Sequence, residues 1–204
     1  MQEISQFLEA PTQKCLDAQK RLTNFIVATK DRGYTIKPDD PGGWDGKSNY
    51  VFTISGESDS EYAKDPSRRS VNSGATYLNN ALIRLLCKMM PIIALSTSEA
   101  ELYAAVLTAM DMMFAYYIVT QLSLNVKLPM LLYVDNKGAV DLANNWSVGG
   151  RTRHIGVKQS YLRELKETGY LQVLHKPGKD LVTDSGTKNV GTVEFWKQTS
   201  TYMS

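Results

Sequence analysis

Cysteine is scarce in this chain. Two cysteines, Cys15 and Cys87, occur among 204 residues, which is too few for a disulfide framework or for a metal site built on thiolates. Any metal site must therefore use other ligands. The low cysteine content fits a reducing compartment best, so we expect an intracellular protein.

Excess charge of one sign is also absent. The formal net charge is only +2 at pH 7, so any surface that binds nucleic acid must be a local one. The start of the chain, Met1-Gln2-Glu3-Ile4, lacks the basic residues and the apolar stretch of a signal peptide. Hydrophobic residues make up 43% of the chain, which is enough for a core and excludes global disorder.

Long hydrophobic runs are rare as well, with one candidate at residues 102–124. Asp111 interrupts this run, and Glu99 and Glu101 stand at its start. A charge near the middle of a membrane span is costly. The run therefore predicts a largely buried core helix, and we expect no membrane association.

The chain divides into three parts by composition. Residues 11–32 predict a helix that Thr12 caps and Gly33 ends, and residues 38–43 predict a turn-rich linker. We therefore expect a helical appendage at residues 1–45, a compact domain at residues 46–190 and a tail at residues 191–204.

The compact domain is predicted to be an α/β fold with a mixed five-stranded sheet flanked by helices. Strands joined by short turns favour antiparallel pairing, whereas strands separated by helices favour parallel crossovers. Strands are expected near residues 51–56, 70–83, 85–95, 130–134 and 170–174, with Asn79-Asn80 as a turn and Pro91 inside the third strand. Helices are expected over the apolar run, opened by a capping box from Ser96 to Glu99, after Asp135, and over residues 153–167 and 180–188.

Four acidic residues stand where these strands end or these helices begin. They are Asp59, Glu101, Asp135 and Asp184. Carboxylates that converge repel one another unless they bind a hard cation such as Mg²⁺. A pair of such ions can cleave a phosphodiester by in-line attack. Taken singly, the same acids have ordinary roles, such as capping a helix or complementing its dipole.

Six short motifs occur in order along the chain. They are Ser58-Asp59-Ser60, Arg68-Arg69-Ser70, Ala94 to Glu101, Val134-Asp135-Asn136, Arg151 to Ile155, and Asp180 to Lys188. Together they resemble the ribonuclease H domain of copia-type retrotransposon Pol polyproteins, over about residues 11–188. Departures from the family include Lys64 in place of Gly and Gly156 in place of Asp, and none of them removes a predicted metal ligand.

The resemblance implies a ribonuclease H-like fold and two Mg²⁺ ions, for which Mn²⁺ can substitute. Asp59 would bridge the ions, Glu101 and Asp135 would complete one, and Asp184 the other. The implied reaction is hydrolysis of the RNA strand of an RNA–DNA hybrid by water, with a 3′-hydroxyl as leaving group. The implied partner is the reverse transcriptase domain of the same polyprotein, in a cytoplasmic virus-like particle or in the nucleus.

Basic and polar residues beside the acidic motifs are the candidates for substrate contact. They are Arg68, Arg69, Asn136, Lys137, Arg151, Arg153, His154 and Lys188. Each has an ordinary surface role as its alternative, and His154 also a capping or packing role, but their positions favour phosphate contact as a group. His175 is a candidate for product release, by analogy with a loop histidine of many ribonucleases H.

A second hypothesis belongs to another class of protein. The apolar run at residues 102–124 could leave a face that needs a partner, which is typical of a catalytically silent module that binds nucleic acid or a polymerase. The methionines near this run suit a core or a partner surface better than a ligand site. The enzyme needs a divalent cation and its carboxylates, whereas a binding module should tolerate loss of Asp135.

Overall fold

The computed structural model describes residues 10–37, 44–46, 49–144, 156–188, 190–200 and 202–203. The chain divides into two compact units, residues 1–35 with 203–204, and residues 36–202. The predicted linker at residues 38–43 lies outside the described residues, and the expected domain limits at residues 45 and 190 stay predictions.

The first unit contains helix α2, Gln13–Ala28. The Thr12 hydroxyl oxygen accepts a hydrogen bond from the backbone N–H of Cys15 (3.4 Å), as its predicted role as N-cap requires. The helix ends before the predicted residue 32, because the next N–H groups bond to carbonyls three residues earlier instead of four: Lys30 to Val27 O (3.5 Å) and Arg32 to Thr29 O (2.9 Å). None of its residues is buried within the described part of the chain.

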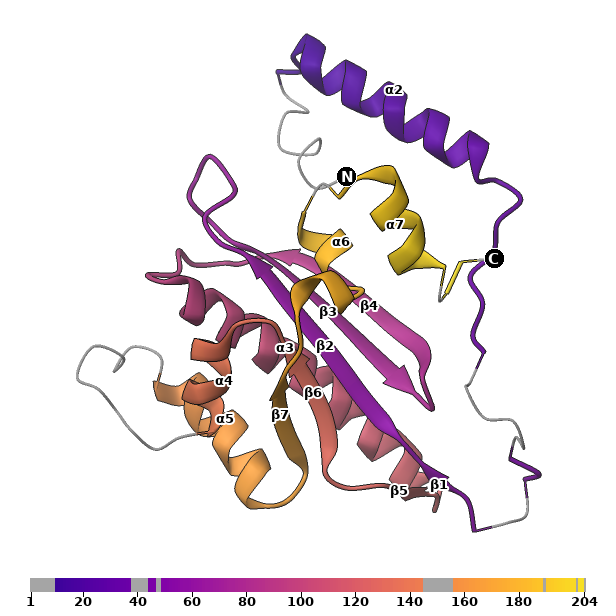
Figure 1. Ribbon diagram of the computed structural model, residues 1–204, viewed down its shortest axis with the longest axis vertical. Helices are drawn as coiled ribbons and strands as arrows, with labels where there is room; N and C mark the ends of the chain where they lie inside the picture. Colours follow the sequence, from indigo (N-terminus) through magenta and orange to yellow (C-terminus); the bar gives the residue numbers. More distant parts are fainter. Residues whose placement is uncertain are drawn as a thin grey trace. The chain divides into compact units, whose positions relative to one another are not determined.

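The second unit is built on a mixed five-stranded sheet, as predicted (Figure 1). Its strands are β2 (Ile54–Glu61), β3 (Val71–Leu78), β4 (Ala81–Met89), β6 (Met130–Val134) and β7 (Leu171–His175). They lie in the order β4-β3-β2-β6-β7; β2–β3 and β3–β4 are antiparallel, and β2–β6 and β6–β7 are parallel. The predicted α/β fold, with three antiparallel strands followed by parallel ones, is thereby confirmed. Two further short strands, β1 (Val51–Phe52) and β5 (Asn125–Val126), pair in parallel beside it.

The hairpin between β3 and β4 corrects two strand predictions. Asn79 and Asn80 both adopt positive φ angles (48° and 62°), which places the turn there and ends β3 five residues before the expected residue 83. Strand β4 therefore begins earlier than expected and ends at Met89. Pro91 lies beyond the strand, so it removes no hydrogen bond from the sheet.

Helix α3, Thr97–Gln121, follows the predicted cap. The Ser96 hydroxyl oxygen accepts from the N–H of Glu99 (3.1 Å), but the Glu99 carboxylate accepts from Leu95 N–H (2.7 Å) rather than from the cap residue itself. In the described part of the chain α3 alone is long and apolar enough to cross a membrane, and half of its most apolar window is buried in the protein. The helix packs on β2, β3 and β6, so it is a core helix, half-buried rather than largely buried.

Two glycines let α3 approach the sheet closely. A Cβ at Gly56 in β2 would lie 2.5 Å from Met112 Sδ, and one at Gly74 in β3 would lie 2.5 Å from Thr108 Oγ1. These distances leave no room for a side chain. The same face of the sheet carries the main hydrophobic core, which includes the fully buried residues Leu102 and Leu132.

The remaining helices surround the sheet. They are α4 (Lys137–Asn144), α5 (Gly156–Glu167), the 3₁₀ turn η2 (Gly178–Asp180), α6 (Asp184–Thr187) and α7 (Thr192–Thr199). The prediction of a single helix over residues 180–188 is wrong, because η2 and α6 are separate. Leu181 is fully buried in an extended conformation and Val182 donates its N–H to the Glu57 carboxylate (2.9 Å), which breaks the helix until Asp184. Helix α7 was not predicted.

Replacing Gly74 by Ala should lower the free energy of unfolding by about 1–3 kcal/mol, because the new methyl group meets Thr108 across the helix–sheet contact. Urea unfolding measures this. Thr108→Ala in the same chain should recover part of the loss, whereas Gly33→Ala, whose methyl would meet nothing within 4 Å, should have little effect. Strictly additive losses at positions 74 and 108 would contradict the close contact.

Candidate metal centre

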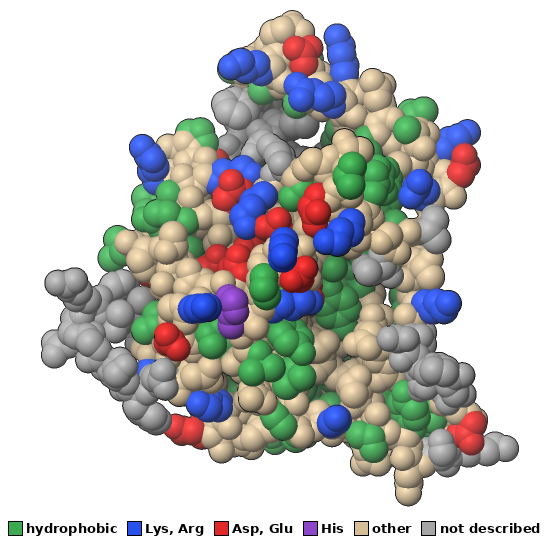
Figure 2. Space-filling view, viewed as in Figure 1, with side chains coloured by type: hydrophobic (Ala, Val, Ile, Leu, Met, Phe, Trp, Pro, Cys, Tyr) green, Lys and Arg blue, Asp and Glu red, His purple; other side chains and the backbone are tan. Residues whose placement is uncertain are grey.

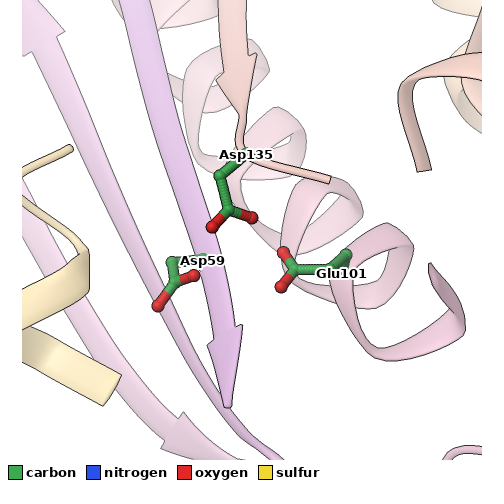
Figure 3. A group of neighbouring side chains, drawn as sticks. All are labelled: Asp59, Glu101 and Asp135. Atoms are coloured by element: carbon green, nitrogen blue, oxygen red, sulfur yellow. The ribbon is translucent and has the colours of Figure 1, made fainter. Parts of the chain in front are cut away.

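Three carboxylates converge at one end of the sheet. Asp59 comes from β2, Glu101 from the start of α3 and Asp135 from the residue after β6, and their side chains point toward one another (Figure 3). One oxygen from each lies within 4.8 Å of the others. Asp59 and Glu101 are buried, and Asp135 is half-buried. Asp59 lies inside its strand, which continues to Glu61, and not at the strand end as expected.

The unequal lengths of two neighbouring strands make room for this cluster. The parallel pairing of β2 with β6 stops at Ser58 and Val134, so β2 runs on beyond the end of β6. The gap lets Glu101 reach the sheet from the helix layer, where its Oε1 accepts a hydrogen bond from the N–H of Ser60 (3.2 Å). The opening at the end of β6 therefore brings together residues far apart in sequence.

The cluster contains carboxylate oxygens that the protein leaves without a hydrogen bond. Oδ1 of Asp59 and Oε2 of Glu101 are buried and accept no hydrogen bond within the described part of the chain. A buried carboxylate in that state is costly. Divalent cations such as Mg²⁺ take such oxygen ligands, so the residues present fit a metal ion.

A nearby buried acid shows the contrast. Glu57 lies two residues before Asp59 on the same strand, and its oxygens accept from Lys176 Nζ (2.5 Å), Val182 N–H (2.9 Å) and Tyr77 Oη (3.2 Å). Because these donors satisfy Glu57 fully, it has no need of an ion. The buried acids of this region thus divide into one structural residue and one unsatisfied cluster.

The cluster holds its protons more tightly than isolated carboxyl groups do. Burial, reinforced by the charges of Asp59 and Asp135, raises the pKa of Glu101 to about 9. Burial also raises the pKa values of Asp59 and Asp135, although the positive charge of Lys188 opposes both shifts. Raised values in a set of neighbouring acids are typical of a functional site.

Asp184, the fourth predicted ligand, lies outside the three-carboxylate group. It begins α6, and its Oδ1 accepts a hydrogen bond from Lys188 Nζ. Its charge nevertheless raises the pKa values of Asp59 and Asp135, so it belongs to the same electrostatic neighbourhood. On the face drawn in Figure 2, several Asp and Glu side chains gather near the centre, with Lys and Arg side chains beside them.

The predicted substrate-contact residues differ in exposure and in their hydrogen-bond partners. Asn136 Oδ1 accepts from Ala139 N–H (2.9 Å) and so caps α4. Arg68, Arg69 and Lys137 are exposed. Lys188 lies at the cluster, where its Nζ donates to Oδ1 of Asp184. The remaining three residues, Arg151, Arg153 and His154, lie outside the described residues. Contact of this group with a substrate stays a prediction.

His175 lies directly beside the cluster. Its Nε2 donates to the backbone carbonyl of Asp135 (3.1 Å), and the ring faces solvent. The next turn also approaches the site, since a Cβ at Gly178 would lie 2.8 Å from Asp135 Oδ2. The position of His175 is compatible with the predicted role in product release, which stays a prediction.

Two residues at the site were missed from the sequence. The Thr187 hydroxyl donates to Oδ2 of Asp59, and Lys64 Nζ donates to the carbonyl of Thr187 (2.7 Å). The closing motif Thr187-Lys188 was a usable signal for the first. For Lys64, the sequence indicates only a departure from the family pattern. No local pattern predicts its contact with Thr187, which is 123 residues away in the chain.

Comparison with known proteins identifies proteins that are similar to most of the chain. Over 94% of its length, the chain is 28% identical in sequence to a retrovirus-related Pol polyprotein from transposon RE1 of Arabidopsis thaliana. Over the same share of its length, it is 28% identical to a retrovirus-related Pol polyprotein from transposon TNT 1-94 of Nicotiana tabacum. The chain is similar to a segment of plant retrotransposon Pol polyproteins. It spans 12% and 14% of the length of these two relatives. The resemblance to copia-type Pol polyproteins is thereby confirmed. No family model matches.

Solved structures of low sequence identity were also found. LC11-RNase H1, isolated from compost, is 12% identical with a TM-score of 0.49, over 66% of this chain and 91% of that one. RNase H1 from Halobacterium salinarum is 15% identical with a TM-score of 0.41, over 61% of this chain and 86% of that one.

The stability of the metal-free protein should fall as pH rises, because the folded state holds the Glu101 proton more tightly than the unfolded chain does. The fall should extend from the ordinary value, 4.5, to about 9. Glu101→Gln stays neutral, so it should be more stable than wild type by at least about 2 kcal/mol near pH 8.5, but similar near pH 5. Urea unfolding in EDTA at both pH values measures the difference. If the free energy of unfolding depended on pH in the same way in wild type and in Glu101→Gln, the raised pKa of Glu101 would be contradicted.

Proposed function

We propose that the domain is a ribonuclease H that hydrolyses the RNA strand of RNA–DNA hybrids during reverse transcription. The observation that carries the proposal is the convergence of three carboxylates with buried oxygens that lack hydrogen bonds. Homology to Pol polyproteins supports the choice of substrate, since reverse transcription produces such hybrids. These relatives are much longer than this chain, so the similarity by itself assigns no activity to it, and the metal-dependent hydrolysis is proposed from the carboxylate cluster.

Asp59, Glu101 and Asp135 would hold Mg²⁺, and Asp184 would contribute to a second ion. Such ions supply activation of water and stabilisation of the leaving oxygen. The chain's own part is to fix the ligands. Thr187 holds one oxygen of Asp59, and the N–H of Ser60 holds one oxygen of Glu101.

Exposed basic residues that follow strands β2 and β6 suit contact with a nucleic-acid backbone. Arg68, Arg69 and Lys137 would contact phosphates, which positions a duplex without reading its sequence. Discrimination of RNA would depend on 2′-hydroxyl contacts across the minor groove. With a net charge of only +2, the domain should bind weakly by itself and depend on a neighbouring polymerase region for affinity.

Asp135→Asn should reduce cleavage of the RNA strand in a labelled RNA–DNA hybrid by at least about a hundredfold with Mg²⁺ or Mn²⁺, because the amide keeps the shape of the side chain but not its charge. Asp141→Asn, the same change at an exposed acid on α4, should leave the rate near that of wild type. Double-stranded DNA and double-stranded RNA serve as control substrates.

Two results would contradict the nuclease assignment. One is equal cleavage by wild type and Asp135→Asn, which would indicate a contaminating enzyme. The other is an intact hybrid after incubation with excess folded wild-type protein and Mn²⁺.

A second candidate function is a docking module for the reverse transcriptase region of the same polyprotein. One side of α3 is apolar and exposed; Met110, Phe114, Tyr117, Ile118 and Leu122 form this α3 apolar face. Beside it lies a groove of about 280 Å³, lined by Ile83 on β4 and by Phe114 and Ile118 on α3. Exposed apolar surface of this kind is typical of an interface. The reverse transcriptase region is the favoured occupant, because the homologous polyproteins contain far more chain than this domain.

Phe114→Glu should weaken binding of a separately produced reverse transcriptase region by more than about tenfold, because Phe114 is 66% exposed at the centre of the α3 apolar face. Val157→Glu, the same charge introduced at an exposed position on α5, should not. Sedimentation or calorimetry measures the affinity. Equal affinities for the two variants would exclude this face as the docking surface.

A further inference from the structure

Lys188 is the cation that the carboxylate cluster already contains. Its Nζ donates to Oδ1 of Asp184, one helical turn earlier, and lies 3.5 Å from Oδ1 of Asp59. That Asp59 oxygen is one of the two buried oxygens of the cluster that accept no hydrogen bond within the described part of the chain. The ammonium group therefore stands next to an atom that is expected to bind a metal ion.

The orientation of the Asp59 carboxylate separates its two oxygens. Thr187, which is buried, donates its hydroxyl hydrogen to Oδ2. Oδ1 is then the oxygen left for a cation, and Lys188 follows Thr187 directly in the chain. Thr187 and Lys188, which are consecutive in the chain, thus lie at the two oxygens of the Asp59 carboxylate: Thr187 donates to Oδ2, and Lys188 approaches Oδ1.

The segment that carries Lys188 is anchored to the sheet. Lys64 Nζ donates to the carbonyl of Thr187 (2.7 Å), and Cys87 Sγ donates to the carbonyl of Gly186 (3.0 Å). Gly186 also lies so close to the strand that a Cβ there would be 2.3 Å from Ser73 Oγ. The backbone from which Lys188 reaches the cluster is therefore held by contacts with three separate parts of the domain.

The segment approaches from the face of the sheet opposite to α3. Gly74 faces Thr108 of α3, and its neighbour Ser73, which must point the other way, faces Gly186. Lys188 thus comes to the cluster from one side and Glu101 from the other. The attraction of the surrounding carboxylates outweighs the burial of Lys188 and raises its pKa, so the group stays charged.

We propose that Lys188 is a built-in counter-ion, which balances the metal-free cluster and gives way when a divalent cation binds. The inference rests on the metal-binding part of the proposed function. A displaced ammonium would be free to meet a phosphate of the substrate, as expected for Lys188 from the sequence. The domain would then stay folded without metal, at the cost of weaker metal affinity.

The test measures metal binding and stability rather than cleavage. Lys188→Met keeps the side-chain length and removes the charge, Lys188→Arg keeps the charge, and Lys179→Met removes the same charge from an exposed residue of η2. Mn²⁺ binding is followed by the electron paramagnetic resonance signal of the free ion. Thermal unfolding is recorded in EDTA and in saturating Mn²⁺.

Lys188→Met should bind Mn²⁺ roughly three- to tenfold more tightly than wild type, because no ammonium competes for Asp59. In EDTA it should unfold about 2–4 °C lower, and in saturating Mn²⁺ the difference should vanish. Lys188→Arg and Lys179→Met should stay close to wild type in both measurements.

Unchanged or weaker Mn²⁺ binding by Lys188→Met would overturn the inference, as would an unchanged unfolding temperature in EDTA. A wild-type protein that binds no Mn²⁺ would overturn it too. A wild-type protein that binds Mn²⁺ but leaves the hybrid uncut would contradict the nuclease proposal instead, and the two failures are thereby distinguished.

Discussion

Mutual repulsion among buried carboxylates is the constraint on which the rest of this structure depends. Asp59, Glu101 and Asp135 bring their oxygens within 4.8 Å in a place largely closed to water. Charging all of them there is unfavourable, and the raised pKa values express this cost. In a stable fold, a bound proton or a nearby cation relieves this repulsion.

The fold meets this constraint by its geometry. β6 stops while β2 continues, so a helix on one face and a short C-terminal segment on the other can both reach the same strand. The helix layer is brought close by Gly56 and Gly74, and it supplies Glu101. The C-terminal segment supplies Thr187 and Lys188, which hold and balance Asp59. On the proposed role of Lys188, its interaction with Asp59 stabilises the metal-free fold and, for the same reason, weakens the binding of a metal ion.

Much of the fold could be predicted from local patterns, because those patterns specify local structure. The Ser96 cap, the Asn79-Asn80 turn and the mixed sheet all follow from residue types whose preferences act within a few positions. The end of the chain could not be predicted in this way. Its apolar residues Leu181 and Val182 suit a helix, but burial of one and a hydrogen bond from the other to Glu57 break it.

In the site, too, local patterns predict some features, whereas others depend on contacts between residues far apart in the sequence. Asp59, Glu101 and Asp135 lie within recognisable motifs and do converge, whereas the position of Asp184 outside the group depends on where α6 begins. The link from Lys64 to the carbonyl of Thr187 joins residues far apart in sequence, and no periodicity encodes such a contact.

The most direct measurement is a crystal structure of the domain soaked in Mn²⁺, with anomalous diffraction used to locate the ion. We predict an anomalous peak between the carboxylates of Asp59, Glu101 and Asp135, at coordination distances of about 2.0–2.3 Å, with Lys188 moved away from Asp59. A map without a peak at this position, with Lys188 still paired to Asp59, would contradict the claim that the cluster is a metal site.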